Sequence, residues 1–478
     1  MEEKKIMVNE NDYEFAMSQG FSEDLAPVPP GKRKWNTFNY FTLWMGSVHN
    51  VPNYVAVGGF LFLGMSPANV MIALILSSFA VIALLVINGM PGFSYGIPFP
   101  VLLKSSYGEV GAKLPGILRG IIAAIMWYGL QTFSGSLALM ILLGKIWPGF
   151  LELGGGFNFF GIGLPGLIAF AIFWIVNLGI GLGGGETISK FTAVLNPLIY
   201  IVFGGMLVWA IRVAGGIGNI LNYSSGVQPA NSHLFIYLMI ISSVLSVWAA
   251  PGASAADFAR NAKSYKAQLI GQSAGLFISY LLFAFSSVCI LVGATLHYGV
   301  EMWNVLDIVN KWDSLFAASF AIIVLLMTTV STNATGNIVP AGYQLASLFP
   351  KKLDYKQGVV VASVISFLIM PWKLMENATS IYAFLDIIGA VVGPVAGVMI
   401  AHYYFEKKQV LNTEDLYTPG DRQYANGINT KAFIATIVGL IFPIGAKFVP
   451  ALARFGSISW ILGFGIAFTI YLAITRKK

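Results

Sequence analysis

The chain has 478 residues, of which 56% are hydrophobic, 14% aromatic and only 10% charged, and its mean hydropathy is +0.74. Soluble domains carry about 25% charged residues, so a globule of this size would lack the charges needed to cover its surface in water. These values indicate a membrane protein and exclude a soluble nucleotide-binding enzyme, a nucleic-acid-binding protein and a secreted disulfide scaffold. The single cysteine, Cys289, can form neither an intramolecular disulfide nor a thiolate zinc site.

The first 37 residues are polar and mixed in charge, and they lack the apolar core of a cleavable signal. We expect them to form a mobile cytoplasmic tail. Apolar runs then repeat along the chain at lengths near the roughly 20 residues that cross a bilayer core. The sequence predicts twelve spans, at residues 38–65, 68–90, 117–139, 164–182, 191–213, 234–255, 267–295, 314–339, 358–375, 381–404, 433–448 and 458–474.

The net charge of +7 is explained by where the basic residues fall between these spans. If both termini are cytoplasmic, 22 of the 28 Lys and Arg lie on the cytoplasmic side, as the positive-inside rule requires for an even number of spans. The positive charge therefore indicates orientation in the membrane rather than a nucleic-acid partner. We predict an all-α polytopic protein surrounded by lipid, with no obligate protein partner.

Two spans contain proline, glycine and polar residues near mid-membrane depth. Residues 44–52 read WMGSVHNVP, and residues 248–254 read WAAPGAS. An irregular backbone at this depth is tolerated only where it lines a cavity or packs within protein. Interrupted helices five spans apart are typical of transporters built from two inverted repeats, although Pro52 and Pro251 could also be ordinary kinks.

The third predicted span carries Trp127 and Gln131, four residues apart and therefore on one face of a helix. A Trp ring can stack on a flat polar ligand while the neighbouring amide both donates and accepts hydrogen bonds. This pair could equally pack against neighbouring helices and bridge them. Alone, it identifies a candidate site and no specific ligand.

Residues 327–337 of the eighth span read MTTVSTNATGN and are unusually rich in hydroxyl and amide groups. Such groups could supply neutral oxygen ligands to a monovalent cation, or they could join helices to one another. Of the four histidines, only His49 lies within a predicted interruption, where it could carry a proton or be held by local hydrogen bonds. No nucleophile elbow or metal-ligand spacing is present in the sequence, so we predict no catalytic residues and no enzyme activity.

Five separated segments carry a family resemblance. They are TLWMGSVHNVPNYVAVGG, IMWYGLQTFSGSLA, VWAAPGASAADFARNA, MTTVSTNATGNIVPAGYQ and MPWKLMEN. Together they resemble the nucleobase-cation-symport family of bacterial permeases, over nearly the whole chain from about Lys34 to the C-terminus. Within that family the sequence is most similar to the allantoin permeases, which share the first-span break and the STNATGN run.

This resemblance implies a LeuT-like fold with a five-plus-five inverted repeat, in which helices 1 and 6 are broken and two peripheral helices follow. The implied division is a cytoplasmic tail at 1–37, a first repeat at 38–213 and a second repeat at 234–404. Spans 11 and 12 then occupy 433–474, and residues 475–478 form a cytoplasmic C-terminus. The implied location is the bacterial inner membrane.

The resemblance also implies the site and the activity. By analogy with hydantoin-carrying relatives, Trp127 and Trp248 would sandwich a flat heterocycle, and Gln131, Asn337 and Asn50 would bind its edges, with His49 beside them. The implied sodium ligands are the carbonyls of Gly46, His49 and Thr328 and the hydroxyls of Ser331 and Thr332.

The function implied is cation-coupled import of allantoin, a hydantoin-ring product of purine breakdown, by alternating access. Either Na+ or H+ could be the coupling ion, and no organic cofactor is expected. A uracil or hydantoin permease is the alternative within the family, and a membrane sensor or membrane enzyme is the alternative outside it.

Overall fold

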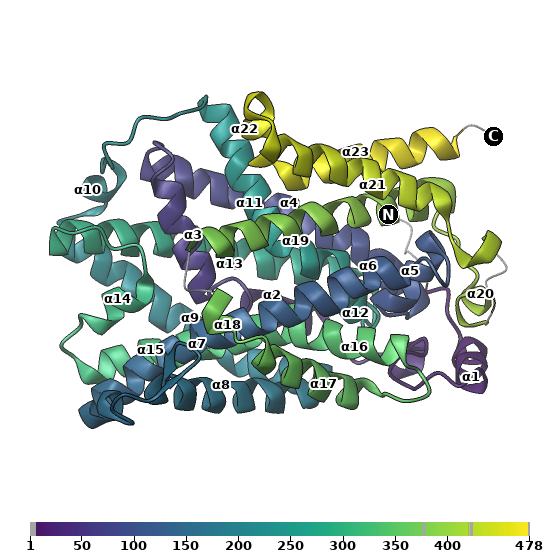
Figure 1. The fold of residues 1–478 in the computed structure, drawn as a ribbon, viewed down its shortest axis with the longest axis horizontal. Helices are drawn as coiled ribbons and strands as arrows, with labels where there is room; N and C mark the ends of the chain where they lie inside the picture. Colours follow the sequence, from purple (N-terminus) through teal and green to yellow (C-terminus); the bar gives the residue numbers. More distant parts are fainter. Residues whose placement is uncertain (1–5, 375–377, 419, 421–423, 477–478) are drawn as a thin grey trace.

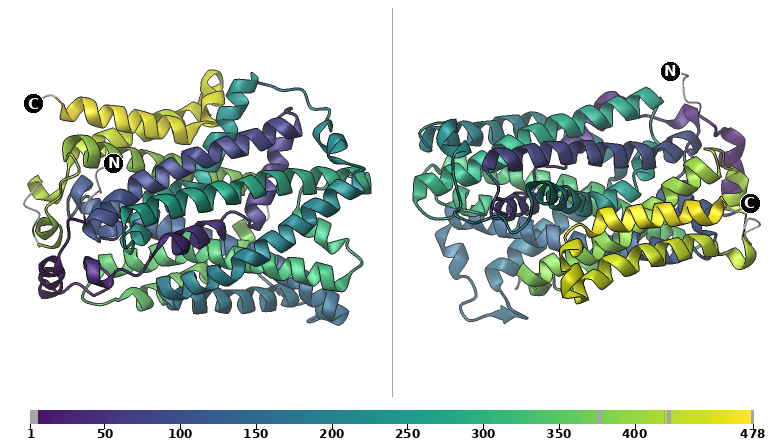
Figure 2. Two further views of the ribbon diagram at one scale, coloured as in Figure 1. Left: turned by 180° about the vertical axis from the view of Figure 1, so that it is seen from behind. Right: turned by 90° about the horizontal axis from the view of Figure 1, so that it is seen from above.

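The computed structural model describes residues 6–374, 378–418, 420 and 424–476. Long helices run side by side along the longest axis, with α21 and α23 along one edge and α8 and α17 along the opposite edge (Figure 1). Further views show the same layered bundle from behind and from above (Figure 2). The described part of the chain is thus mainly helical, in agreement with the predicted class.

The bounds of the elements follow in chain order. The first half contains α1 (Glu10–Ser18), α2 (Thr37–Met45), α3 (Val51–Leu61), α4 (Pro67–Tyr95), α5 (Phe99–Tyr107), α6 (Lys113–Ile117), α7 (Ala124–Ile146), β1 (Asn158–Phe159), β2 (Ile162–Gly163), α8 (Leu164–Leu182), α9 (Gly184–Val213) and α10 (Ile217–Leu221). The second half contains α11 (His233–Ala253), α12 (Ala256–Ala259), α13 (Tyr265–Tyr298), α14 (Val305–Asn310), α15 (Leu315–Asn333), α16 (Val339–Leu348), α17 (Tyr355–Leu368), α18 (Pro371–Leu374), α19 (Ala378–Ala401), α20 (Thr413–Tyr417), α21 (Thr430–Gly445), α22 (Ala453–Gly456) and α23 (Ser459–Thr475).

The described residues contain three π-helical turns, of which η5 (His402–Glu406) follows α19 and the other two connect helices. The turn η2 (Leu118–Ala123) joins α6 to α7, and the turn η4 (Ala334–Ile338) joins α15 to α16. Such π-helical turns are frequent at functional sites.

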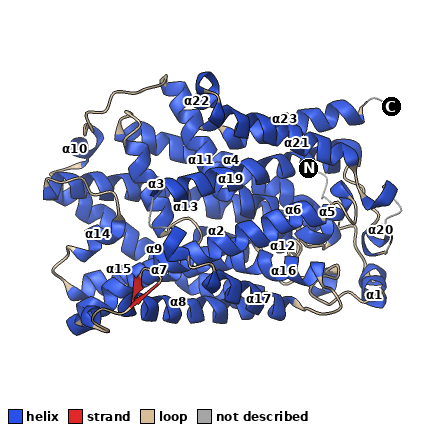
Figure 3. Cartoon of the chain, in the orientation of Figure 1, coloured by secondary structure: helices blue, strands red, loops and turns tan. Residues whose placement is uncertain are grey.

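The strands β1 and β2 form a small antiparallel hairpin that the sequence did not predict (Figure 3).

Helices or helix pairs coincide with the predicted spans, and most extend a few residues beyond the predicted ends. Among the described residues, eight helices are long and apolar enough to cross a membrane, and three further apolar helices, α3, α17 and α23, are shorter. The protein is therefore a multi-pass α-helical membrane protein. Helix α3 is short because residues 46–50 divide it from α2, and α17 is short because Ile369 and Met370 divide it from α18.

The predicted interruption of the sixth span around Pro251 is wrong in its position. Helix α11 continues through Trp248 and Pro251 and ends at Ala253, and the irregular residues are Ser254 and Ala255, before α12. Membrane helices tolerate proline when neighbouring groups pair with the released carbonyls. The break therefore lies three residues further along the chain than the proline pattern indicates.

The expectation of a mobile N-terminal tail is also wrong for the described part of that tail. Helix α1 begins with a capping box between Asn9 and Asp12. The amide of Val28 donates to the carbonyl of Gly96 at 2.9 Å, and that of Met7 to the carbonyl of Ser94 at 2.8 Å. The tail is thus held against the end of α4 by backbone hydrogen bonds.

A buried arginine joins three of the long helical segments. Arg119, in η2, is 1% exposed. Its Nε donates to the carbonyl of Ala250, and its Nη2 donates to Ser254 Oγ at 2.7 Å and to the carbonyl of Gly336 at 3.1 Å. The guanidinium therefore pairs carbonyls released near the end of α11 and in η4, which helps to explain why α11 ends where it does.

Replacing Arg119 by alanine is expected to destabilise the protein strongly. The carbonyls of Ala250 and Gly336 would lose a charged donor, and hydrogen bonds to charged groups contribute about 1.5–3 kcal/mol each. Thermal unfolding of the purified protein in detergent measures the effect, with Lys34→Ala as a control because Lys34 forms only an exposed ion pair with Glu186 at 3.9 Å. Equal unfolding temperatures for the two variants would contradict this role of Arg119.

Candidate functional site

The first predicted interruption is present. Helix α2 ends at Met45, α3 begins at Val51, and residues 46–50 between them are not helical. Two residues explain why a new helix begins here: Asn50 accepts a hydrogen bond from the amide of Asn53 at 3.1 Å as the N-cap, and Pro52 occupies the first turn. Asn is a favoured N-cap, and proline needs no N–H partner in a first turn.

The unwound carbonyls are paired by side chains from other elements. The carbonyl of Ser47 accepts from Thr332 Oγ1 of α15 at 3.1 Å and from Asn50 Nδ2 at 3.2 Å. The carbonyl of Val48 accepts from Asn53 Nδ2 at 2.7 Å. Because an unpaired backbone group in hydrocarbon costs several kcal/mol, these side chains allow the helix to be interrupted.

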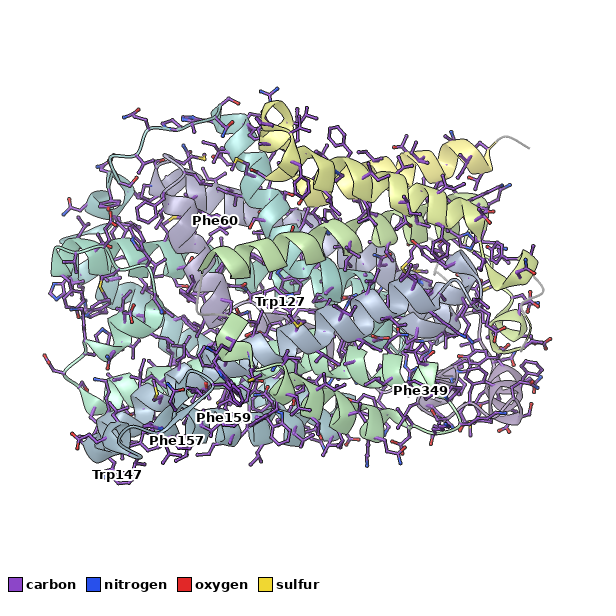
Figure 4. All side chains as sticks on the ribbon, viewed as in Figure 1. Phe60, Trp127, Trp147, Phe157, Phe159 and Phe349 are labelled. Carbon is purple, nitrogen blue, oxygen red and sulfur yellow. The ribbon has the colours of Figure 1, made fainter. Side chains whose placement is uncertain are left out.

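A cavity of about 490 Å³ lies beside this break. Figure 4 places Trp127 near the centre of the molecule. Five of the six predicted substrate residues line the cavity: Asn50, Trp127, Gln131, Trp248 and Asn337. The structure thus brings together side chains from α3, α7, α11 and η4 that are as much as 287 positions apart in the sequence numbering, from Asn50 to Asn337.

The side chain of His49, the sixth predicted residue, is not among the described residues that line the cavity. Its ring is fully buried and lies 4.4 Å from the ring of Phe203, measured between centroids. Its Nδ1 is 3.2 Å from the hydroxyl of Tyr54, which is in turn 3.1 Å from Ser286 Oγ. The imidazole therefore packs against α9 and α13.

The amides in the cavity differ in how they are engaged. Both ends of the Asn50 amide are bonded, because its Nδ2 donates to the carbonyl of Ser47 and to Thr332 Oγ1 while its Oδ1 caps α3. Gln131 Oε1 is buried and has no hydrogen-bond partner among the described residues. Asn337 Nδ2 donates to Asn333 Oδ1 at 2.9 Å, which fixes the orientation of its amide. Among the three predicted amides, Gln131 and Asn337 are therefore the best placed to bind a ligand.

Sequence reasoning did not identify several residues of this wall. Trp44, Asn53, Ser243 and Thr335 also line the cavity. Trp44 lies 5.8 Å from Trp248 between ring centroids, with the two ring planes tilted by 58°. Helical spacing could have found Asn53, one turn after the Asn50 cap, but no sequence signal distinguishes Ser243 from the other serines of α11.

The predicted cation ligands lie where the break meets α15. A methyl group placed on Gly46 would be 2.9 Å from Ser331 Oγ, so the backbone there approaches this hydroxyl closely. Ser331 Oγ is buried and has no partner among the described residues. Thr332 Oγ1 lies 2.9 Å from the carbonyl of Thr328. An orphaned hydroxyl beside unwound backbone fits a small cation, because carbonyls of unwound helices coordinate coupling ions in membrane proteins with interrupted helices.

Comparison with known proteins gives consistent results. A family described as "Permease for cytosine/purines, uracil, thiamine, allantoin" matches residues 27–463. An Escherichia coli (strain K12) protein, provisionally named an allantoin permease, is 56% identical over 98% of this chain and 97% of its own length. The allantoin permease of Bacillus subtilis (strain 168) is 40% identical over 95% of this chain and 93% of its own length.

The fold is also similar to that of solved transporters. Mhp1, a nucleobase-cation-symport-1 family transporter solved in a closed conformation with bromovinylhydantoin bound, matches with a TM-score of 0.80 at 22% identity. The match covers 96% of this chain and 95% of Mhp1. A Na+-coupled sialic acid symporter matches with a TM-score of 0.63 at 11% identity, over 97% of this chain and 94% of the symporter. At these identities the similarity shows a shared fold.

Chemical labelling of two neighbouring serines tests the cavity. Ser243 lines it, whereas Ser242 is buried at 1% exposure. We expect Ser243→Cys to react much faster than Ser242→Cys with a small thiol reagent, because thiol reactivity depends on access. The native Cys289 is buried and should add little background. Equal labelling of the two variants would contradict the described cavity.

Proposed function

Because the chain belongs to the family of permeases for cytosine, purines, uracil, thiamine and allantoin, we propose that it is a secondary active transporter that imports allantoin. The family consists of permeases rather than enzymes. The observation that carries the proposal is the cavity beside the broken first span, which is lined by three tryptophans, Trp127 and Trp248 among them, and by the unpaired oxygen of Gln131. Such a site binds a flat molecule that carries alternating hydrogen-bond donors and acceptors.

The proposed topology has twelve spans with both termini in the cytoplasm of a bacterium, and the membrane is the inner one. Residues 38–213 and 234–404 form two inverted repeats, and residues 433–474 form two peripheral spans. The distribution of Lys and Arg supports this orientation. The break between α2 and α3 and the irregular residues between α11 and α12 support the repeats, since they lie in the first and sixth spans.

The substrate ring lies between Trp127 and Trp248 in this proposal. Stacking contributes about 0.5–1.5 kcal/mol per aromatic contact beyond the buried area, whereas an unpaired buried polar group costs about 1–3 kcal/mol. The tryptophans therefore set affinity for flat rings in general, and Gln131 and Asn337 select among them. Asn50 holds the break in shape beside the ring. His49 contributes its backbone carbonyl, while its ring packs against Phe203 of α9 and Phe283 of α13.

Sodium is the proposed coupling ion. It is held by the carbonyls of Gly46, His49 and Thr328 and by the hydroxyls of Ser331 and Thr332. The orphaned Ser331 Oγ supports this site. The burial of the His49 ring among Tyr54, Phe203 and Phe283 favours sodium over a proton carried by this histidine.

Uptake of labelled allantoin into proteoliposomes tests the substrate and the site together. Trp127→Ala should raise the KM for allantoin about tenfold, equivalent to the loss of about 1.4 kcal/mol of binding free energy. Trp147→Ala is the control, because Trp147 is 56% exposed and distant from the cavity lining (Figure 4). Saturable uptake of labelled uracil or hydantoin, without saturable uptake of labelled allantoin, would replace the proposed substrate. An unchanged KM in Trp127→Ala would contradict the proposed ring site.

The same assay with an imposed sodium gradient tests the coupling ion. Ser331→Ala should abolish the stimulation by sodium, because it removes a hydroxyl ligand. Thr329→Val is a matched control on the same helix. The Thr329 hydroxyl already donates a hydrogen bond to the carbonyl of Leu325 at 2.8 Å, and we do not assign it to the cation site. Uptake driven by a proton gradient and indifferent to sodium in the unmodified protein would show that the coupling ion is H+.

A further inference from the structure

The cavity extends beyond the residues that would hold a ring. Its wall also includes Phe60, Leu63 and Met239, which are apolar, and polar residues interrupt this apolar surface, among them Asn53 on α3 and Ser243 on α11. We propose that Asn53 and Ser243 form a second subsite that recognises the ureido substituent of the substrate. This inference rests on the proposed transport function and adds the residues that distinguish allantoin from an unsubstituted hydantoin.

Asn53 and Ser243 lie on the same part of the wall. Both line the main cavity, and both also line a small pocket of about 20 Å³ that lies beside Trp248 and is backed by Tyr280 and Phe283. Ser243 precedes Trp248 by five residues on α11, a rise of about 7.5 Å along the helix axis. Along the helix axis, Ser243 is therefore displaced from Trp248 by about the length of a small substituent.

The hydrogen bonds of Asn53 leave its oxygen available. Asn53 Nδ2 donates to the unwound carbonyl of Val48 at 2.7 Å, which identifies the nitrogen and directs the Oδ1 elsewhere. No described residue donates to this oxygen, and the side chain is part of the cavity lining. Asn53 therefore presents an acceptor to the cavity, held in place by the break itself.

Ser243 provides the complementary donor. Its hydroxyl forms no hydrogen bond with any residue that the structure describes. Ser246, one turn later on the same cavity wall, instead donates its hydroxyl to the carbonyl of Ser242 at 2.9 Å. The hydroxyl of Ser243 is thus available to a ligand in the cavity, whereas the hydroxyl of Ser246 is already engaged.

The chemistry of the pair matches a ureido group. That group carries several N–H donors and one carbonyl acceptor, so Asn53 Oδ1 can accept from an N–H while the Ser243 hydroxyl donates to the carbonyl. Hydantoin and uracil lack such a substituent and cannot form these bonds from a position between Trp127 and Trp248. A site that hydrogen-bonds a polar substituent discriminates against analogues that lack it.

The test compares the KM values of labelled allantoin and labelled hydantoin in proteoliposomes that contain the full chain. Ser243→Ala should raise the KM for allantoin about three- to tenfold, as expected for one lost hydrogen bond, and leave the KM for hydantoin unchanged. Asn53→Ala also removes the donor to the carbonyl of Val48, so it should raise both KM values, and the KM for allantoin by the larger factor. Ser242→Ala, on the same helix but buried and outside the cavity lining, should change neither value. Ser243→Thr, which keeps the hydroxyl, should retain part of the preference for allantoin.

The outcomes separate this inference from the function on which it rests. Equal changes for the two substrates would show that the variants disturb the break or the fold, and would overturn the inference, as would no change for either substrate. Uptake of allantoin by the unmodified protein establishes the transport function independently of both variants. Failure of the unmodified protein to carry allantoin would overturn the proposed function itself.

Discussion

The central constraint on this protein is that residues 46–50 leave the helical conformation inside a membrane-spanning bundle, where water cannot pair their backbone groups. Neighbouring side chains instead form hydrogen bonds with these backbone groups. Asn50 and Pro52 begin a new helix, Asn53 pairs the carbonyl of Val48, and Thr332 pairs the carbonyl of Ser47. The same groups form one wall of the cavity and one side of the candidate cation site, so the site is a consequence of how the break is stabilised.

This arrangement gives a physical basis for coupling. Through Asn50 and Ser47 the break is hydrogen-bonded to Thr332, on the helix that also carries Ser331 and leads into Asn337. A cation bound between the break and α15 would hold the two elements in the geometry that the substrate needs. A ligand shifts a conformational equilibrium only by its differential affinity for the two states, and here both ligands would favour the same arrangement of the first and eighth spans. Arg119 joins η2 to α11 and η4 in a similar way, through released carbonyls.

Much of the fold and part of the site follow from the sequence alone, since hydrophobic length predicts the helices and the Asn-Val-Pro pattern predicts the break. The position of the second break did not follow, because Pro251 is accommodated within α11 and the helix ends where Arg119 and Ser254 pair the carbonyl of Ala250. The direction of the His49 ring and the roles of Asn53 and Ser243 depend on which helices pack together and on which hydrogen bonds are already formed. The polar composition of the N-terminal segment likewise did not predict its backbone hydrogen bonds to Ser94 and Gly96 at the end of α4.

Reciprocal binding measurements test most directly the claim that the break joins the two sites. The affinity of the purified protein for allantoin, followed by tryptophan fluorescence, should be about fivefold or more tighter in sodium chloride than in choline chloride, and allantoin should tighten sodium binding by the same factor. An allantoin affinity that is the same in both salts would contradict the claim.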